Sequence, residues 1–149
     1  MNVNEDIKIN ANVLIQLFDE NGKLKAERKI HNTVTTAGKQ GIADQMLASP
    51  TLPKGAWMEL GTGTGGTTLL TAYIASSRHA VSPATDRSGA IVSYYHTWAA
   101  GEGTGAIAEA GLFDVATQNT VNMWLYASFD VINKAAGDTL AITWTLTFA

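Results

Sequence analysis

The chain has 149 residues, a net charge of −3 and no cysteine. This length suits one domain and is too short for two ordinary ones, and the lack of cysteine excludes disulfides and thiolate metal sites. The acidic balance argues against a dedicated nucleic-acid binder, and no apolar stretch approaches the ~20 residues of a membrane span. The polar N-terminus lacks the features of a signal peptide, so we expect neither a leader nor a membrane contact.

Charged residues make up only 15% of the chain, below the roughly 25% of typical soluble domains, and Thr, Ala and Gly take their place. Such a surface suits a protein that packs against copies of itself or against other partners. A monomeric, Thr-rich β domain would have the same composition, so composition leaves both interpretations open.

The N-terminal part predicts an arm followed by a hairpin. Residues 1–9 are mostly polar and predict the arm, with a single β-sandwich domain over 10–149. An apolar segment at 12–18 predicts a strand, and the Asn-Gly dipeptide at 21–22 favours a tight turn because such turns need positive φ. The returning strand covers 23–32.

Half of the ten basic residues lie between positions 23 and 39. Lysines along one strand are typical of a sheet edge that is protected from aggregation. The alternative is a basic patch that docks on an acidic partner surface. On that alternative the candidate contact residues are Lys23, Lys25, Arg28 and Lys29.

One helix is predicted over 36–48. Thr35 or Thr36 can cap its start, and Pro50 follows its end because proline cannot continue the backbone hydrogen bonds. The apolar stripe of this helix consists of Ile42, Ala43, Met46 and Leu47. Residues 67–77 form a second, shorter candidate helix.

The rest of the chain predicts strands separated by turns. The last strand alternates most cleanly, with threonines on one face and large apolar residues on the other, namely Leu140, Ile142, Trp144, Leu146 and Phe148. The strand over 121–131 alternates in the same way, and residues 133–138 predict a hairpin between the two. We therefore expect a mostly all-β protein, an antiparallel, jelly-roll-like β-sandwich of seven or eight strands.

A glycine-rich run at 61–66 is the strongest signal for an enzyme. Gly61, Gly63 and Gly66 have the spacing of a dinucleotide-binding loop, and Asp86 follows at a suitable distance. Such a site needs parallel strands joined by helices, whereas the later strands predict antiparallel hairpins. We therefore expect no cofactor here.

The other polar residues show no pattern of a catalytic or metal site. His31, His79 and His96 share no metal-ligand spacing, and the sequence has no Gly-x-Ser-x-Gly motif. Glu102 and Glu109 could act together on a sugar, although turn and interface carboxylates are commoner. We expect no catalytic residue, no metal ligand and no enzyme activity.

Trp124 and Tyr126 lie opposite the apolar parity of their strand. This position predicts that they face solvent, a second layer or a partner. Exposed aromatic residues anchor protein contacts and also stack on sugars, and we favour a protein contact. These two residues complete the set of candidate contact residues.

Five short motifs resemble a group of small virion proteins of tailed bacteriophages. They occur in the same order over residues 30–148 and are His31-Asn-Thr-Val-Thr-Thr-Ala-Gly-Lys39, Ile42-Ala-Asp44, Leu60-Gly-Thr-Gly-Thr64, Gly101-Glu-Gly-Thr-Gly-Ala-Ile-Ala-Glu-Ala-Gly-Leu-Phe113 and Gly137-Asp-Thr-Leu-Ala-Ile-Thr-Trp-Thr-Leu-Thr-Phe148. Proteins of this group serve as head decoration (cement) proteins or as other head or tail components, and they have no catalytic motif. The first 30 residues lie outside the resemblance.

The resemblance implies a non-enzymatic decoration protein on the outer surface of the capsid, made in the host cytoplasm. Its partner would be the major capsid protein, and we expect a homo-oligomer, with a trimer as the first choice. Two alternatives stay open: a tail or baseplate component, and a carbohydrate- or receptor-binding module that uses Trp98 and Trp124.

Overall fold

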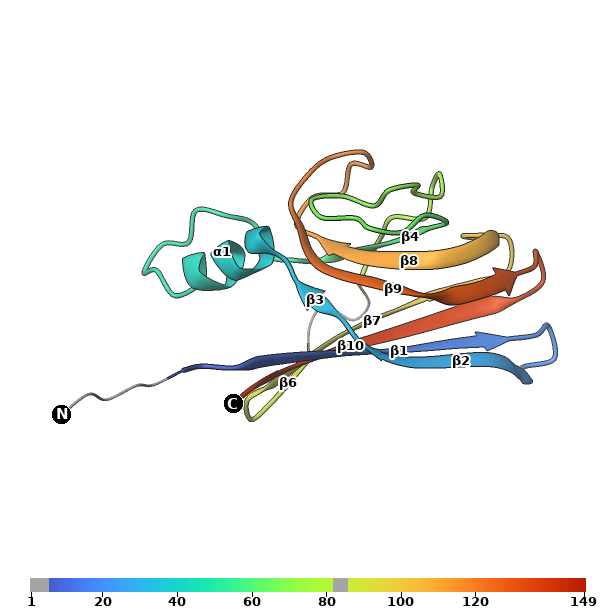
Figure 1. Ribbon diagram of the computed structural model, residues 1–149, viewed down its shortest axis with the longest axis horizontal. Helices are drawn as coiled ribbons and strands as arrows, with labels where there is room; N and C mark the ends of the chain where they lie inside the picture. The colour runs from blue at the N-terminus through green and yellow to red at the C-terminus, as the bar shows by residue number, and fades with distance from the viewer. Residues whose placement is uncertain (1–5, 82–85) are drawn as a thin grey trace.

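Two antiparallel sheets face one another and enclose the main core (Figure 1). The computed structural model describes residues 6–81 and 86–149, and within these residues each sheet has five strands. The predicted all-β sandwich is therefore confirmed, although the described residues form ten strands and not seven or eight.

The first sheet is built around the last strand of the chain. Its strands are β1 (Ile9–Phe18), β2 (Leu24–His31), β6 (Asp86–Ser88), β7 (Ile91–Trp98) and β10 (Thr139–Phe148), in the spatial order β2-β1-β10-β7-β6. β10 pairs with β1 on one side and with β7 on the other. Its alternation is as predicted, because Leu140, Ile142, Trp144 and Leu146 are buried between the sheets while threonines occupy the outer face.

The second sheet is covered on both of its faces. Its strands are β3 (Thr33–Val34), β4 (Trp57–Gly61), β5 (His79–Ala80), β8 (Gly105–Phe113) and β9 (Met123–Lys134), in the spatial order β3-β9-β8-β4-β5. Seven consecutive residues of β8, Ile107 to Phe113, are buried, which a sheet with one solvated face would not allow. The irregular segment 62–78 lies over the outer face, and the helix α1 (Thr36–Asp44) lies beside one end of the sheet, where it packs against Trp124 on β9 (Figure 1).

Two tryptophans, Trp98 on β7 and Trp144 on β10, are fully buried in the core between the sheets. The indole N–H of Trp98 donates to the carbonyl of Ser77 at 2.8 Å, which ties the segment before β5 to the first sheet. Burial of one large apolar side chain contributes roughly 1.5–3 kcal/mol, so these rings contribute substantially to holding the two sheets together.

The connection between β9 and β10 differs from the predicted hairpin. β9 belongs to the second sheet and β10 to the first, so residues 135–138 carry the chain from one sheet to the other. Asp138 holds this turn, since its carboxylate accepts hydrogen bonds from the Ala135 N–H at 2.9 Å and from the Lys25 Nζ at 2.8 Å. The predicted hairpin is wrong because alternation does not reveal whether two consecutive strands share a sheet.

α1 starts where the sequence predicts and ends earlier. The Thr35 Oγ1 accepts a hydrogen bond from the Gly38 N–H at 3.0 Å, which makes Thr35 the N-cap. The helix ends at Asp44, four residues before the predicted end at position 48, with Gln45 as its C-cap.

The short helix packs through two glycines and through Ile42, a member of the predicted apolar stripe that packs against the main core. Gly38 and Gly41 are buried, and a Cβ atom on either residue would collide with Trp124. Met46 and Leu47, two members of the predicted stripe, lie beyond the helix and are 85% and 54% exposed.

The second predicted helix, over 67–77, is wrong. Segment 62–78 crosses the outer face of the second sheet without a helical turn and is anchored at a few points. Leu70 packs beside Phe113 and Met123, and the Ala72 N–H donates to the buried Glu109 carboxylate at 2.9 Å. The apolar spacing that predicted a helix here belongs to a loop that inserts single side chains.

The predicted N-terminal arm is shorter than residues 1–9. β1 already includes Ile9, and Lys8 exchanges two backbone hydrogen bonds of 2.9 Å with Ala149. Ile7 is 81% exposed, and residues 1–5 lie outside the described residues.

Candidate interaction surface

The four basic candidate residues do not form one patch. Lys25 pairs with Asp138 at 2.8 Å and Lys29 lies 3.5 Å from the Glu27 carboxylate, so both cations have acidic partners. Arg28 has the inward parity of β2 and donates to the Val131 carbonyl at 3.3 Å. β2 is an edge strand of the first sheet, which agrees with the interpretation of a lysine-protected edge.

Lys23 lies apart from these three side chains, in the turn between β1 and β2. It is exposed, and its backbone N–H donates to the Asp19 carboxylate at 2.9 Å. Gly22 adopts a φ of +80° there, as the predicted Asn-Gly turn requires. A docking patch made of all four cations is therefore not present on one face of the molecule.

The two aromatic candidates, Trp124 and Tyr126, are buried, with exposed fractions of 4% and 8%. Trp124 lies beneath α1, and the Tyr126 ring lies beneath Gly66 of segment 62–78. Of the three predicted environments, the structure shows the second layer for Tyr126, whereas Trp124 belongs to the main core. We therefore withdraw both residues as contact candidates, because the cover of the second sheet leaves them almost no surface to offer.

Exposed apolar side chains gather instead on the loop that follows α1, residues 45–53, which we name the 45–53 loop. Met46, Leu47 and Leu52 are 85%, 54% and 43% exposed. The loop projects from the same end of the molecule as the start of β1 (Figure 1). The sequence contained one signal for this loop, because Pro50 and Pro53 cannot continue a helix. The apolar residues that precede them are therefore not held against the core by a helix.

Hydrogen bonds fix the shape of the 45–53 loop. The Asp44 carboxylate accepts from the Thr51 N–H, the Leu52 N–H and the Thr51 hydroxyl at 2.9, 2.8 and 2.7 Å. The Gln45 side-chain amide donates to the Leu52 carbonyl at 3.0 Å. The hydrogen bonds that Asp44 accepts, with that from Leu52 the strongest cause, lower the pKa of Asp44, so the carboxylate stays charged and keeps its three donors. The apolar side chains are thus presented on an ordered scaffold, which reduces the entropy lost on binding.

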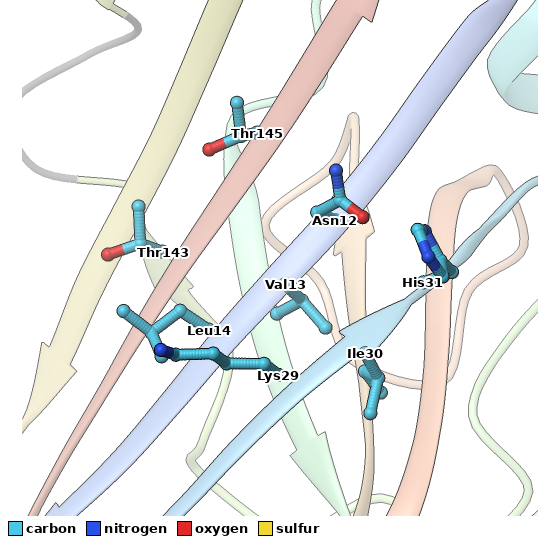
Figure 2. A pocket seen from close by; sticks show the side chains of 8 residues that line it. All are labelled: Asn12, Val13, Leu14, Lys29, Ile30, His31, Thr143 and Thr145. Atoms are coloured by element: carbon cyan, nitrogen blue, oxygen red, sulfur yellow. The ribbon is translucent and has the colours of Figure 1, made fainter.

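The outer face of the first sheet is a second open surface. A shallow hollow of about 400 Å³ lies on it, lined mainly by outward side chains of β1, β2 and β10. Figure 2 shows Asn12 and Leu14 on β1 beside Thr143 and Thr145 on β10, with Lys29 and His31 on β2. Strand pairing continues this surface onto β7, where Tyr95 is paired with Thr143 and is 39% exposed. The face is flat, rich in hydroxyl groups and poor in charge.

The carboxylates that the sequence considered for sugar chemistry have structural partners. Glu109 is fully buried, and its carboxylate accepts hydrogen bonds from the Tyr126 hydroxyl and the Ala72 N–H, each at 2.9 Å. Glu102 accepts from the Ala99 N–H at 2.9 Å in the turn after β7. Glu109 does not reach an open cleft, so this pair does not form the predicted alternative site.

The glycine run also has a structural explanation. Gly61 lies against Glu109, since a Cβ atom at this position would come within 2.5 Å of the Glu109 Oε1, and a Cβ on Gly66 would come within 2.6 Å of the Leu69 carbonyl oxygen. β4 pairs antiparallel with β8 and β5 and leads into segment 62–78, not into a helix. Asp86 begins β6, which belongs to the other sheet. These contacts explain the glycines without a nucleotide.

A buried ion pair fastens the cover of the second sheet. The Arg78 guanidinium donates to both oxygens of Glu59 at 3.0 and 3.2 Å and lies 3.6 Å from the centre of the Phe113 ring. The same guanidinium donates to the carbonyls of Val115 and Thr117 at 3.2 and 2.6 Å. These contacts of Arg78 join strands β4 and β8 to the loops outside them, which indicates a structural role.

Two histidines that the sequence separates come together in the fold. His79 on β5 and His96 on β7 have ring centres 5.0 Å apart, and the His96 ring stands edge-on to Trp98. Residue spacing contains no sign of this pair, because the two strands belong to different sheets. Within residues 6–81 and 86–149, no group of three or more His, Asp or Glu side chains is arranged to hold a metal ion.

Comparison of the chain with protein-family models, with curated proteins and with solved structures gives no match. No helix in the described part of the chain is long and apolar enough to span a membrane.

Proposed function

We propose that this protein is a non-enzymatic structural component of a tailed-bacteriophage virion, and specifically a decoration (cement) protein on the outer surface of the capsid. Its partner is the major capsid protein, and its role is to stabilise the head shell by bridging neighbouring shell subunits. The five motifs over residues 30–148 support this proposal, since they resemble small virion proteins of this kind.

The 45–53 loop is the observation that carries the proposal. Full burial of one large apolar side chain contributes roughly 1.5–3 kcal/mol, and Met46, Leu47 and Leu52 expose much of their surface in the isolated chain. A contact of this size is weak for one copy, but a shell repeats it at many equivalent places. Rigid apolar groups at one end of a stiff sandwich suit a protein that adds stability by burial at subunit junctions.

Bridging two subunits requires a second contact surface, and the outer face of the first sheet is available for it. The face is low in charge and partly apolar around Leu14 and Tyr95, as surfaces between protein subunits tend to be. Copies that meet at a symmetry axis of the shell would form a homo-oligomer there, and a trimer suits a threefold junction.

Shell binding by paired variants tests the proposal. Met46→Ser combined with Leu47→Ser removes the exposed apolar groups without touching the core, and should lower the affinity for purified shells by about 10- to 100-fold. The matched control is Val121→Ser combined with Val131→Ser, which removes side chains that are 53% and 50% exposed elsewhere. Equal occupancy for both double variants would contradict the role of the 45–53 loop.

The N-terminal segment is tested separately. Deletion of residues 1–7 leaves the paired Lys8 and Ala149 in place, so the sandwich stays intact. If the segment contributes a contact, as Ile7 with its 81% exposure suggests, occupancy on shells falls. Unchanged occupancy removes this segment from the proposed contact surface.

The two alternative functions have their own tests. A tail or baseplate position is decided by locating the chain in whole particles. A carbohydrate-binding module loses support from the aromatic residues first considered for it, because Trp98 and Trp124 are 0% and 4% exposed. Tyr95 is the aromatic side chain that the open face of the first sheet offers, and selective binding on a glycan array would favour that alternative.

A further inference from the structure

The pair His79 and His96 lies between the two sheets. His79 belongs to β5, the edge strand of the second sheet, and His96 belongs to β7 of the first. Their rings are tilted by 43° with centres 5.0 Å apart, within the range of an ordinary aromatic contact. The His79 Nε2 lies 3.0 Å from the Ser76 carbonyl oxygen and donates to it, so Nδ1 is the nitrogen of His79 that is left to bind a ligand. A ligand shared by both rings would link the sheets directly.

His96 has unused binding capacity. Both of its ring nitrogens, Nδ1 and Nε2, are buried, and among the described residues neither has a hydrogen-bond partner. Whichever tautomer is present, one nitrogen offers a lone pair and the other an N–H. Buried polar groups in native proteins nearly always have a partner, and an unpaired one calls for a water molecule or an ion.

The separation of the two rings fits one shared metal ion. A histidine nitrogen binds Zn²⁺ at about 2.0–2.1 Å, so with roughly 1.2 Å from nitrogen to ring centre and a tetrahedral angle, two rings on one ion have centres about 5.2 Å apart. The observed distance is 5.0 Å. Burial and the neighbouring His79 also lower the pKa of His96, which keeps its imidazole in the neutral form that binds metals.

We infer that His79 and His96 form a two-imidazole site for a late first-row divalent cation, Zn²⁺ in the first place, that joins β5 to β7. Imidazole nitrogen suits Zn²⁺, Cu²⁺ and Ni²⁺, whereas Mg²⁺ and Ca²⁺ prefer oxygen. Because the described residues supply no group of three ligands, water or a small anion completes the coordination, and the affinity is moderate. The carboxylate of Glu102 attracts positive charge at His96 and favours the cation further.

Titration of the untagged, EDTA-treated full chain with ZnCl₂ tests this inference. We expect one ion per chain with a dissociation constant below about 100 µM by calorimetry. At about 100 times that constant, bound Zn²⁺ should raise the Tm by about 5–10 °C, whereas MgCl₂ should not. Imidazole ¹⁵N chemical shifts should change for two histidines and not for the third.

Three single variants assign the site. His79→Gln and His96→Gln should each weaken Zn²⁺ binding by at least about 100-fold, because one remaining imidazole cannot chelate. His31→Gln is the matched control, since this exposed histidine lies on β2 of the first sheet. His79 is only half-buried at a sheet edge, so its variant should fold even if that of His96 does not.

Two results would overturn the inference. One is the absence of Zn²⁺ binding to the unmodified chain at 1 mM, a concentration of about ten times the expected upper limit of the dissociation constant. The other is binding that survives His79→Gln or is lost in His31→Gln. Neither result bears on the proposed role in the virion, which depends on other surfaces.

Discussion

The two sheets of this sandwich differ in how much of the outer face is covered. In the first sheet, large side chains of β10 face the core and threonines remain on an open outer face. In the second sheet, β8 is buried on both faces from Ile107 to Phe113 and β9 from Met123 to Ala127, where segment 62–78 and α1 pack against them. The cover brings polar groups inside, and nearly every such group has a defined partner, as Glu59, Arg78 and Glu109 show. The outer layer of the second sheet is therefore structural, and the outer face of the first remains free for partners.

Loss of the buried ion pair should give the largest effect. Arg78→Met leaves the Glu59 carboxylate buried without its cation, and breaking such a pair typically costs about 3–5 kcal/mol. The control is Arg87→Met on β6, where the arginine is exposed and should change stability by less than about 0.5 kcal/mol. Urea unfolding of both variants measures the difference. Similar free energies of unfolding for the two variants would contradict a structural role for the cover.

Phenylalanine substitutions at two tyrosines, Tyr126 and Tyr95, compare the outer faces of the two sheets directly. Tyr126→Phe removes a hydrogen bond of 2.9 Å to the buried Glu109 and should cost about 1–3 kcal/mol, because a buried carboxylate loses a donor. Tyr95→Phe removes a hydroxyl from the open face of the first sheet and should be nearly neutral, within about 0.5 kcal/mol. Thermal unfolding of the pair is the measurement. An equal loss at both positions would mean that the two faces do not differ as described.

Two glycines test the contact of α1 with the second sheet. A Cβ at Gly41 collides with the Trp124 ring, so Gly41→Ala should cost about 1–3 kcal/mol even though alanine favours a helix. A Cβ at Gly137 would lie 3.6 and 3.8 Å from its nearest neighbours, an ordinary contact, so Gly137→Ala should leave stability within about 0.5 kcal/mol. The difference in denaturant midpoint decides whether α1 is packed as tightly as this contact requires.

Acid should weaken the turn that joins the two sheets, with the smallest effect of the four. Hydrogen bonds from Lys25 and Ala135 lower the pKa of Asp138 in the folded protein. At a pH above about 3.9, the pKa of an Asp carboxyl in the unfolded chain, the Asp138 carboxylate stabilises the folded state. This stabilisation is lost as the pH falls through the lower pKa that Asp138 has in the folded protein. Asp138→Asn should reduce the acid sensitivity of the Tm between pH 6 and pH 3, whereas Asp130→Asn, at an exposed position, should not. Parallel curves for both variants would contradict this assignment.

In the first sheet, the sequence was sufficient to predict β10, since this strand has one face for the core and one for the exterior and its periodicity shows it. It failed for the second sheet in ways that have physical reasons. Alternation suggested that Trp124 and Tyr126 lie on the outer face, which is correct for Tyr126 and wrong for Trp124, whose ring packs in the main core. No local pattern shows that segment 62–78 covers Tyr126, or that Gly38 and Gly41 of α1 pack against Trp124, which is far away in the chain.

The candidate contact surfaces, too, could be predicted from the sequence only in part. The lysines predicted a protected sheet edge, with a contact patch as the alternative, and the pairing of Lys25 with Asp138 depends on long-range geometry that the sequence does not contain. Met46 and Leu47 were assigned to a helix face, and only the hydrogen bonds of Asp44 show that the chain leaves the helix there. The motifs that resemble virion proteins span both sheets, so their order along the chain does not reveal which surface is free.

The proposed place in a virion is tested most directly by electron cryomicroscopy of intact phage particles that contain this chain. The account predicts repeated density for the sandwich on the outside of the head shell, with the 45–53 loop against neighbouring capsid subunits and the covered side of the second sheet away from that contact. Density for this chain in the tail or baseplate, or a head shell that lacks it, would contradict the account.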